Sequence, residues 1–162
     1  MDFFNIQFVR RALVMFFVTG FLSVSNEGYS QCKEARSRTT GEITKYFRIQ
    51  AKGAAEQIVV SNTSHRYKIT YENRLNNDPR FRVKVGDELT ITSDSGTFSV
   101  PITESINVAN GYNVSAELSK EDLIKLRGFQ KITFPASSGG QLVVLNKRKS
   151  QKLSIAINCL NQ

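Results

Sequence analysis

Residues whose side chains could do chemistry are few in this sequence. His65 is the only histidine, and it lies in the polar run 61–66, which predicts a turn. A zinc site built on it would need carboxylates alone as co-ligands, and a serine–histidine–aspartate triad would have no other base. We therefore expect His65 to lie on the surface, and we expect neither a metal nor a cofactor.

Carboxylates form a second group near the middle of the chain. Asp87, Glu88 and Asp94 flank a predicted hairpin and Glu104 follows it, so they could act as paired carboxylates or hold calcium. Their spacing matches no calcium loop, and turn formation accounts for the aspartates. We expect no catalytic residue and no enzyme. The alternative is a hydrolase-type enzyme with a carboxylate-only site, which a pocket gathering these four groups would favour.

A cluster of cations near the end of the chain is the candidate anion-binding site: Lys147, Arg148, Lys149 and Lys152. If Asn146 caps a helix here, three cations lie in its first turn, where the helix dipole disfavours them by about 0.3–1 kcal/mol. Unpaired N–H groups at the same end attract anions. Such a local conflict points to function. The alternative is a solvated basic turn before a helix that begins at Ser150.

Only two cysteines occur, Cys32 and Cys159. We expect them to form a disulfide, which would restrict the unfolded chain and stabilise the fold by roughly 4–5 kcal/mol. Two alternatives remain open, a lipid on Cys32 and two free thiols. The residues before Cys32, Tyr29-Ser30-Gln31, lack the Leu-x-small pattern that lipoprotein sites resemble.

The first 30 residues have the layout of a secretory signal peptide. Arg10 and Arg11 precede the apolar run 12–22, which is short for a membrane-spanning helix of roughly 20 apolar residues. Cleavage before Gln31 fits the small-x-small rule, and cleavage after Ser25 fits nearly as well. We therefore expect an exported protein, periplasmic, at the cell surface or secreted, without a transmembrane anchor after cleavage.

The chain is basic, with a formal net charge of +8. Single-stranded nucleic acid would require aromatic side chains among the exposed cations, and most aromatic residues fall on the predicted core side. We therefore expect no nucleic acid as a partner, and instead an anionic lipid, glycan or protein of the envelope. The alternative is that the charge serves solubility alone. We expect an exported, non-catalytic binding or structural module.

Most of the chain alternates apolar and polar residues with the period of a β-strand. We expect 31–40 to be a mobile leading segment and 41–162 to be a single, mainly β (α+β) domain. Its antiparallel sheet is predicted to be sandwich-like or curved. Pro101 places its strand at an edge or ends it. The predicted strands are 43–50, 66–72, 81–85, 88–92, 98–102, 113–118, 129–134 and 141–145.

Two helices complete the prediction. The first spans 119–127, because Ser119 can cap it with Asp122 at the capping-box position and Gly128 can end it. The second spans 147–160, because Leu153, Ala156, Ile157 and Leu160 recur with helical spacing.

Four segments carry a resemblance to known proteins: Gly41-Glu42, Asp87-Glu88-Leu89-Thr90, Leu118-Ser119-Lys120-Glu121-Asp122-Leu123, and the end of the chain from Lys152-Leu153 to Asn158-Cys159-Leu160. With them and Gln31 after a small residue, the sequence resembles small exported β-rich proteins of Bacteroidetes-type bacteria. The resemblance implies the compartment and the fold. It implies no active site.

Overall fold

The protein is built around one curled antiparallel sheet, which a computed structural model describes over residues 32–53, 55–74, 82–108, 111–135 and 140–162. In these ranges nine strands follow the order β1-β2-β3-β4-β7-β6-β5-β8-β9. The strands are β1 (Lys33–Arg36), β2 (Ile43–Gln50), β3 (Glu56–Thr63), β4 (Arg66–Asn73), β5 (Glu88–Ser93), β6 (Gly96–Val108), β7 (Gly111–Leu118), β8 (Lys131–Thr133) and β9 (Leu142–Val144). The predicted signal peptide lies outside the described residues.

The two faces of the sheet differ as the alternating pattern predicts. On β4, Tyr67, Ile69 and Tyr71 are buried toward the concave side, whereas Lys68 and Thr70 point to the convex side. The apolar row continues on the neighbouring strands, because Ile69 pairs with Val60 of β3 and with Ala116 of β7. The prediction of a mainly β fold with a curved antiparallel sheet is confirmed.

The curl arises where β6 passes from one half of the sheet to the other. Its first residues pair with β5, and its last residues pair with β7. The register shifts between Ile102 and Glu104, directly after Pro101. An irregularity of this kind bends a strand and increases its twist. Pro101 therefore lies inside a 13-residue strand that does not end there, at the point where pairing with β5 gives way to pairing with β7.

Three further segments differ from the sequence prediction. Part of the leading segment 31–40 forms β1, which pairs with β2 from Lys33↔Tyr46 to Arg36↔Ile43. Residues 82–85 of the predicted strand 81–85 are not a strand: Val83 is buried, but Val85 lies in a turn and is 66% exposed. β3 was not predicted, because its polar end from Ser61 to Thr63 was interpreted as part of a turn.

Helix α2 (Lys120–Lys125) has the predicted cap, although it is shorter than the predicted 119–127. The Ser119 hydroxyl accepts a hydrogen bond from the Asp122 N–H at 3.0 Å, and the Asp122 carboxylate accepts one from the Ser119 N–H at 3.3 Å. Gly128 has φ +68° just after the helix, as predicted.

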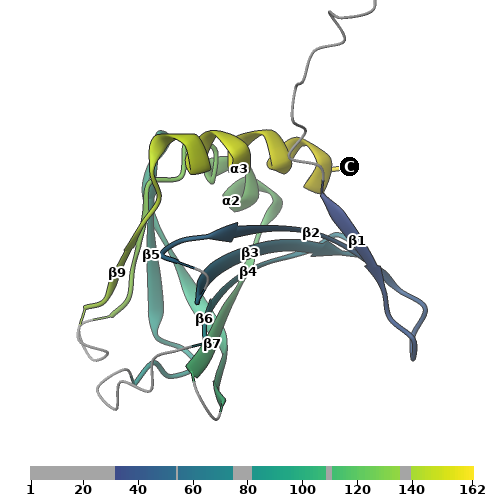
Figure 1. Ribbon diagram of the computed structural model, residues 1–162, viewed down its shortest axis with the longest axis horizontal. Helices are drawn as coiled ribbons and strands as arrows, with labels where there is room; N and C mark the ends of the chain where they lie inside the picture. Colours follow the sequence, from purple (N-terminus) through teal and green to yellow (C-terminus); the bar gives the residue numbers. More distant parts are fainter. Residues whose placement is uncertain (1–31, 54, 75–81, 109–110, 136–139) are drawn as a thin grey trace, which may run out of the picture.

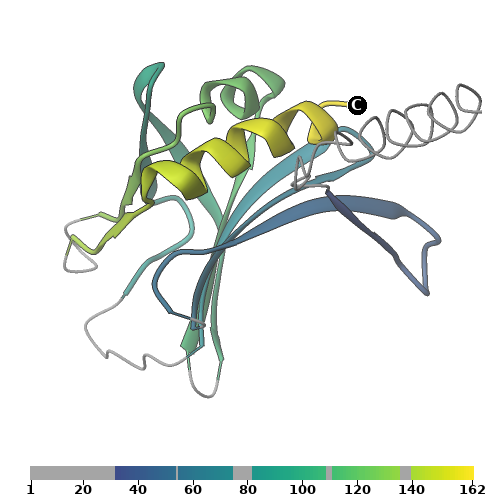
Figure 2. The same ribbon diagram turned by 45° about the horizontal axis from the view of Figure 1, so that its top comes forward.

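Helix α3 (Lys147–Leu160) has the bounds that the sequence predicts, and it fills the concave side of the sheet. Figure 2 shows it crossing the curled strands, with α2 beside it. Leu153, Ala156, Ile157 and Leu160 are fully buried. The sheet alone would leave its concave apolar face in water, and α3 covers that face.

Candidate anion-binding surface

The first turn of α3 is set by Asn146. This residue has extended backbone, and its side-chain oxygen accepts a hydrogen bond from the Lys149 N–H at 2.9 Å. Asparagine is among the preferred residues at this position. The helix therefore begins at Lys147, and the alternative in which it begins at Ser150 was wrong.

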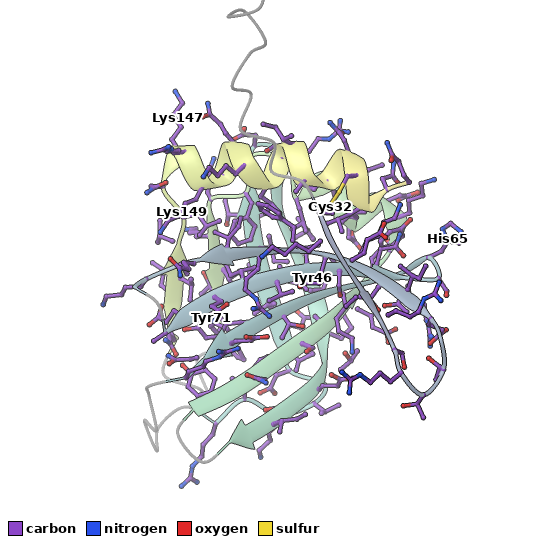
Figure 3. The ribbon with its side chains drawn as sticks, turned by 45° about the vertical axis from the view of Figure 1, so that its right-hand side comes forward. Cys32, Tyr46, His65, Tyr71, Lys147 and Lys149 are labelled. Atoms are coloured by element: carbon purple, nitrogen blue, oxygen red, sulfur yellow. A yellow bond between two sulfur atoms is a disulfide. The ribbon has the colours of Figure 1, made fainter. Side chains whose placement is uncertain are left out.

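The cations of this turn have different surroundings. The first turn contains no acidic residue. Lys147 and Arg148 are exposed, and no described residue forms an ion pair or a side-chain hydrogen bond with either. Figure 3 shows Lys147 projecting away from the sheet. Lys152 is exposed one turn further along the helix.

Lys149 points the other way. Its Nζ donates a hydrogen bond to the carbonyl oxygen of Ala51 at 3.0 Å, in a partly buried position. Ala51 directly follows β2, so this contact fastens the start of α3 to the sheet. Of the four predicted anion-binding residues, Lys149 thus contacts the sheet, and the side chains of Lys147, Arg148 and Lys152 are exposed.

The first turn of α3 combines positive side chains with the positive end of the helix dipole, which is electrostatically unfavourable. Lys147 and Arg148 lie beside the positive end of the α3 dipole. The backbone N–H groups of this first turn have no carbonyl partner within the helix. Both effects favour an anion at this end. A phosphate or a carboxylate is the kind of group that this arrangement can hold.

The far end of α3 is fixed by a disulfide between Cys32 and Cys159, whose Cα atoms are 6.3 Å apart. This bridge confirms the predicted pairing and excludes both a lipid on Cys32 and free thiols. The Asn62 side chain donates to the Leu160 carbonyl at 2.8 Å. The basic turn is therefore presented by a helix that is held at both ends.

The four carboxylates of the alternative enzyme site have separate surroundings. Asp87 accepts a hydrogen bond from the Lys84 N–H at 2.9 Å, and Asp94 accepts one from the Gln130 side chain at 3.0 Å. Glu104 pairs with Lys68 at 2.8 Å. Glu88, at the start of β5, pairs in register with Pro101. Asp87 and Asp94 thus flank opposite ends of β5, and Asp87, Asp94 and Glu104 each engage a different partner.

His65 lies in the tight turn between β3 and β4, and it is exposed. Ser64 and His65 both have positive φ, 50° and 64°. Non-glycine residues seldom adopt this conformation. The Asn62 side chain stabilises the turn by accepting a hydrogen bond from the His65 N–H at 2.9 Å.

Sequence reasoning missed a buried polar network on the concave side. The Tyr112 hydroxyl donates to the Gln141 side-chain oxygen at 2.7 Å, and Asn73 donates to the hydroxyls of Tyr71 and Tyr112 at 3.4 Å. Burial raises the pKa of Tyr71 and of Tyr112 above the ordinary value of 10.0. Phe134 packs on Tyr71, with ring centroids 5.1 Å apart. The network ties β4 and β7 to the β8–β9 hairpin. No local pattern predicts it, because its members come from three distant segments.

A shallow hollow of about 270 Å³ lies on the convex face, lined by Ser61, Thr63, Arg66, Tyr67, Lys68 and Glu117. Its cations already have partners, because Arg66 pairs with Glu42 at 3.6 Å and Lys68 pairs with Glu104. It is therefore a weaker candidate for an anion than the first turn of α3.

Two further features concern the described residues only. No group of three or more histidine, cysteine, aspartate or glutamate residues is arranged there to hold a metal ion. Among the helices of these ranges, none has the length and the apolar character needed to cross a membrane.

No protein-family model matches the chain, and neither a curated protein nor a solved structure matches it. The resemblance to small exported proteins therefore stays a prediction.

Proposed function

We propose that the protein is an exported, non-catalytic binding module, which contacts anionic components of the cell envelope through the first turn of α3. The observation that carries this proposal is the exposure of Lys147 and Arg148, without any partner in the described residues, at a helix end that already favours anions. Lys152 extends the positive surface along the helix. The net charge of +8 attracts anionic surfaces over a longer range.

Export is part of the proposal. The signal-peptide pattern of the first 30 residues supports it, and a disulfide between Cys32 and Cys159 is typical of an oxidising compartment. The mass of the protein recovered from outside the cytoplasm tests it. Loss of residues 1–30, or of residues 1–25, is expected. An intact leader on the exported protein would contradict this part.

The proposal that the protein is not an enzyme rests on the separate surroundings of its candidate carboxylates. Asp87, Asp94 and Glu104 each engage a different partner, and Asp87 and Asp94 lie in turns. Paired carboxylates of a glycosidase lie within roughly 5–10 Å of each other on either side of the scissile bond. A sugar-hydrolysing activity lost in Glu104→Gln would favour the enzyme instead.

Binding is tested with vesicles of phosphatidylcholine alone and of phosphatidylcholine mixed with phosphatidylglycerol, and with a heparin column. The protein is expected to bind the anionic vesicles and heparin, and not the neutral vesicles. The double variant Lys147→Gln/Arg148→Gln is expected to bind about fivefold more weakly, because two exposed charge contacts are lost.

The matched control is Lys84→Gln/Lys120→Gln, which removes the same charge from two exposed side chains elsewhere. It is expected to retain most of the binding. Equal loss in both double variants would show that net charge alone attracts the anion, and it would remove the assignment to α3. Lys149 is left unchanged, because its substitution would disturb the contact with Ala51.

A further inference from the structure

The sheet has two outer strands, β1 and β9, at opposite ends of the strand order. Within the described ranges each pairs with a single neighbour, β1 with β2 and β9 with β8. Figure 1 shows β9 on one flank of the molecule, leading directly into α3. The backbone groups on the outer edge of such a strand are available to another extended chain.

The hydrogen-bond pattern identifies which residues of β9 present these groups. The Phe134 N–H donates to the Gln141 carbonyl at 2.9 Å, and the Leu145 N–H donates to the Gln130 carbonyl at 2.8 Å. Hydrogen-bonded and non-hydrogen-bonded pairs alternate along an antiparallel ladder. The intervening Leu142 and Val144 therefore direct their N–H and C=O groups away from β8, toward the outer edge.

The side chains of the same two residues are apolar and exposed, Leu142 by 52% and Val144 by 57%. The opposite edge differs, because β1 carries Lys33, Glu34 and Arg36, all exposed. Charged side chains are a common protection of an edge strand against pairing. β9 is short, which also limits pairing, but it has no charged side chain at its outward positions Leu142 and Val144.

Charge indicates what kind of chain would pair with β9. Lys131 is the register partner of Val144, and Lys147 and Arg148 follow β9 after a short connection. None of these three cations forms an ion pair with a described residue. A second copy of this chain would bring its own positive charge, +8 in total, to the same edge. An acidic partner complements it.

We propose that the outer edge of β9 binds an extended acidic segment of a partner protein by strand addition. The added strand is antiparallel, like every strand pair described in the sheet. It carries apolar residues at alternate positions beside Leu142 and Val144. Its acidic residues precede them in sequence and lie against Lys147 and Arg148. This inference rests on the proposed function, because it names a protein segment as the anionic partner of the basic turn.

The probe is a synthetic peptide with blocked ends, Asp-Asp-Val-Thr-Val-Thr-Val, and its counterpart has Lys-Lys in place of Asp-Asp. Binding is measured by fluorescence anisotropy with the full protein. The acidic peptide is expected to bind about fivefold or more tightly than the basic one. Equal binding of the two peptides, or no binding of the acidic one, would overturn the inference.

The variant Val144→Pro removes one outward N–H and leaves the bonds of β9 to β8 in place, since proline is tolerated on an outer edge. It is expected to weaken binding of the acidic peptide roughly tenfold. The matched control is Arg36→Pro on the outer edge of β1. The Ser37 N–H donates to the Glu42 carbonyl, so the same alternation places the Arg36 N–H outward. This control is expected to bind the peptide normally.

Three measurements separate the possible failures. Val144→Ser keeps the N–H and removes the apolar side chain without adding a charge, and it too is expected to weaken binding of the acidic peptide; unchanged binding in both variants at position 144 would overturn strand addition. Val144→Pro is expected to bind anionic vesicles unchanged. Vesicle binding without peptide binding would reject this inference and leave the proposed function standing. A dimer of the protein that Val144→Pro dissociates would assign the edge to a second copy instead.

Discussion

Lys149 donates a hydrogen bond from its Nζ to the carbonyl oxygen of Ala51, at 3.0 Å, and so joins the first turn of α3 to the end of β2. Its neighbours Lys147 and Arg148 have no such contact in the described part of the chain. Lys149 therefore stabilises the fold through a hydrogen bond. Lys147 and Arg148 make no such contact and are repelled by the positive end of the helix dipole.

Substitutions in this turn should change stability in opposite directions. Lys147→Gln and Arg148→Gln are each expected to raise the free energy of unfolding by about 0.3–1 kcal/mol, because a cation leaves the positive end of the helix dipole. Lys149→Met is expected to lower it by about 1 kcal/mol, since the Ala51 carbonyl loses its donor. Urea denaturation measures the free energy of unfolding of all three variants. A loss of stability in Lys147→Gln would contradict the dipole argument.

The disulfide should contribute the largest single increment of stability. Cys32 and Cys159 are separated by 127 positions, and closing a loop of that length restricts the unfolded chain by about 4–5 kcal/mol in the chain-entropy model. The double variant Cys32→Ser/Cys159→Ser is expected to lose much of this in denaturant unfolding. Reductant should destabilise the native protein to a similar extent and leave the double variant unaffected.

The buried tyrosines should make the fold sensitive to alkali. Burial raises the pKa of Tyr71 and Tyr112 above 10.0, so the folded chain holds these protons more tightly than the unfolded chain. Their contribution is present below pH 10 and is lost as the pH rises toward the folded-state pKa. The free energy of unfolding should fall above about pH 10. Tyr71→Phe should show a smaller fall, and an unchanged pH profile would contradict this origin.

The cap of α2 should make a contribution that acid removes. Burial alone would raise the pKa of Asp122, but hydrogen bonds from Ser119 and Lys125 outweigh it and hold the pKa below 3.8. This contribution is therefore present above pH 3.8 and lost as the pH falls through the folded-state pKa. Ser119→Ala is expected to cost about 1 kcal/mol at neutral pH. Asp122→Asn should reduce the acid dependence of unfolding, with Glu121→Gln as the exposed control.

Gly111 is required by the close approach of β7 to the end of β4. A Cβ atom on it would overlap the carbonyl oxygen of Asn73. Gly111→Ala is therefore expected to lower the free energy of unfolding by more than about 1 kcal/mol. Gly140→Ala is the comparison, because Gly140 has a positive φ of 60° but a Cβ atom there would meet no other atom within 4 Å. A smaller loss in Gly111→Ala than in Gly140→Ala would contradict the steric argument.

Local chemistry was sufficient to predict the helices and most of the strands. Ser119, Asp122 and Gly128 set the limits of α2 through contacts within a few residues, and Leu153, Ala156, Ile157 and Leu160 mark one face of α3 by their spacing alone. The disulfide was also predictable, since a chain with only two cysteines has one possible intramolecular pairing. Within the candidate site, the sequence indicated the cluster of cations and left two possible helix starts open, and the structure places the cap at Asn146.

Tertiary structure alone decided the relations between distant segments. The different surroundings of Lys147 and Lys149 depend on where Ala51 lies, 98 residues from Lys149. Likewise, Val144 could be recognised as an outward edge residue only after β8 had been paired on one side of it. Short-range forces, which the amino-acid sequence makes readable, determined both helices and most of the strands. Pairing and packing over long separations determined which side chains were left exposed to bind.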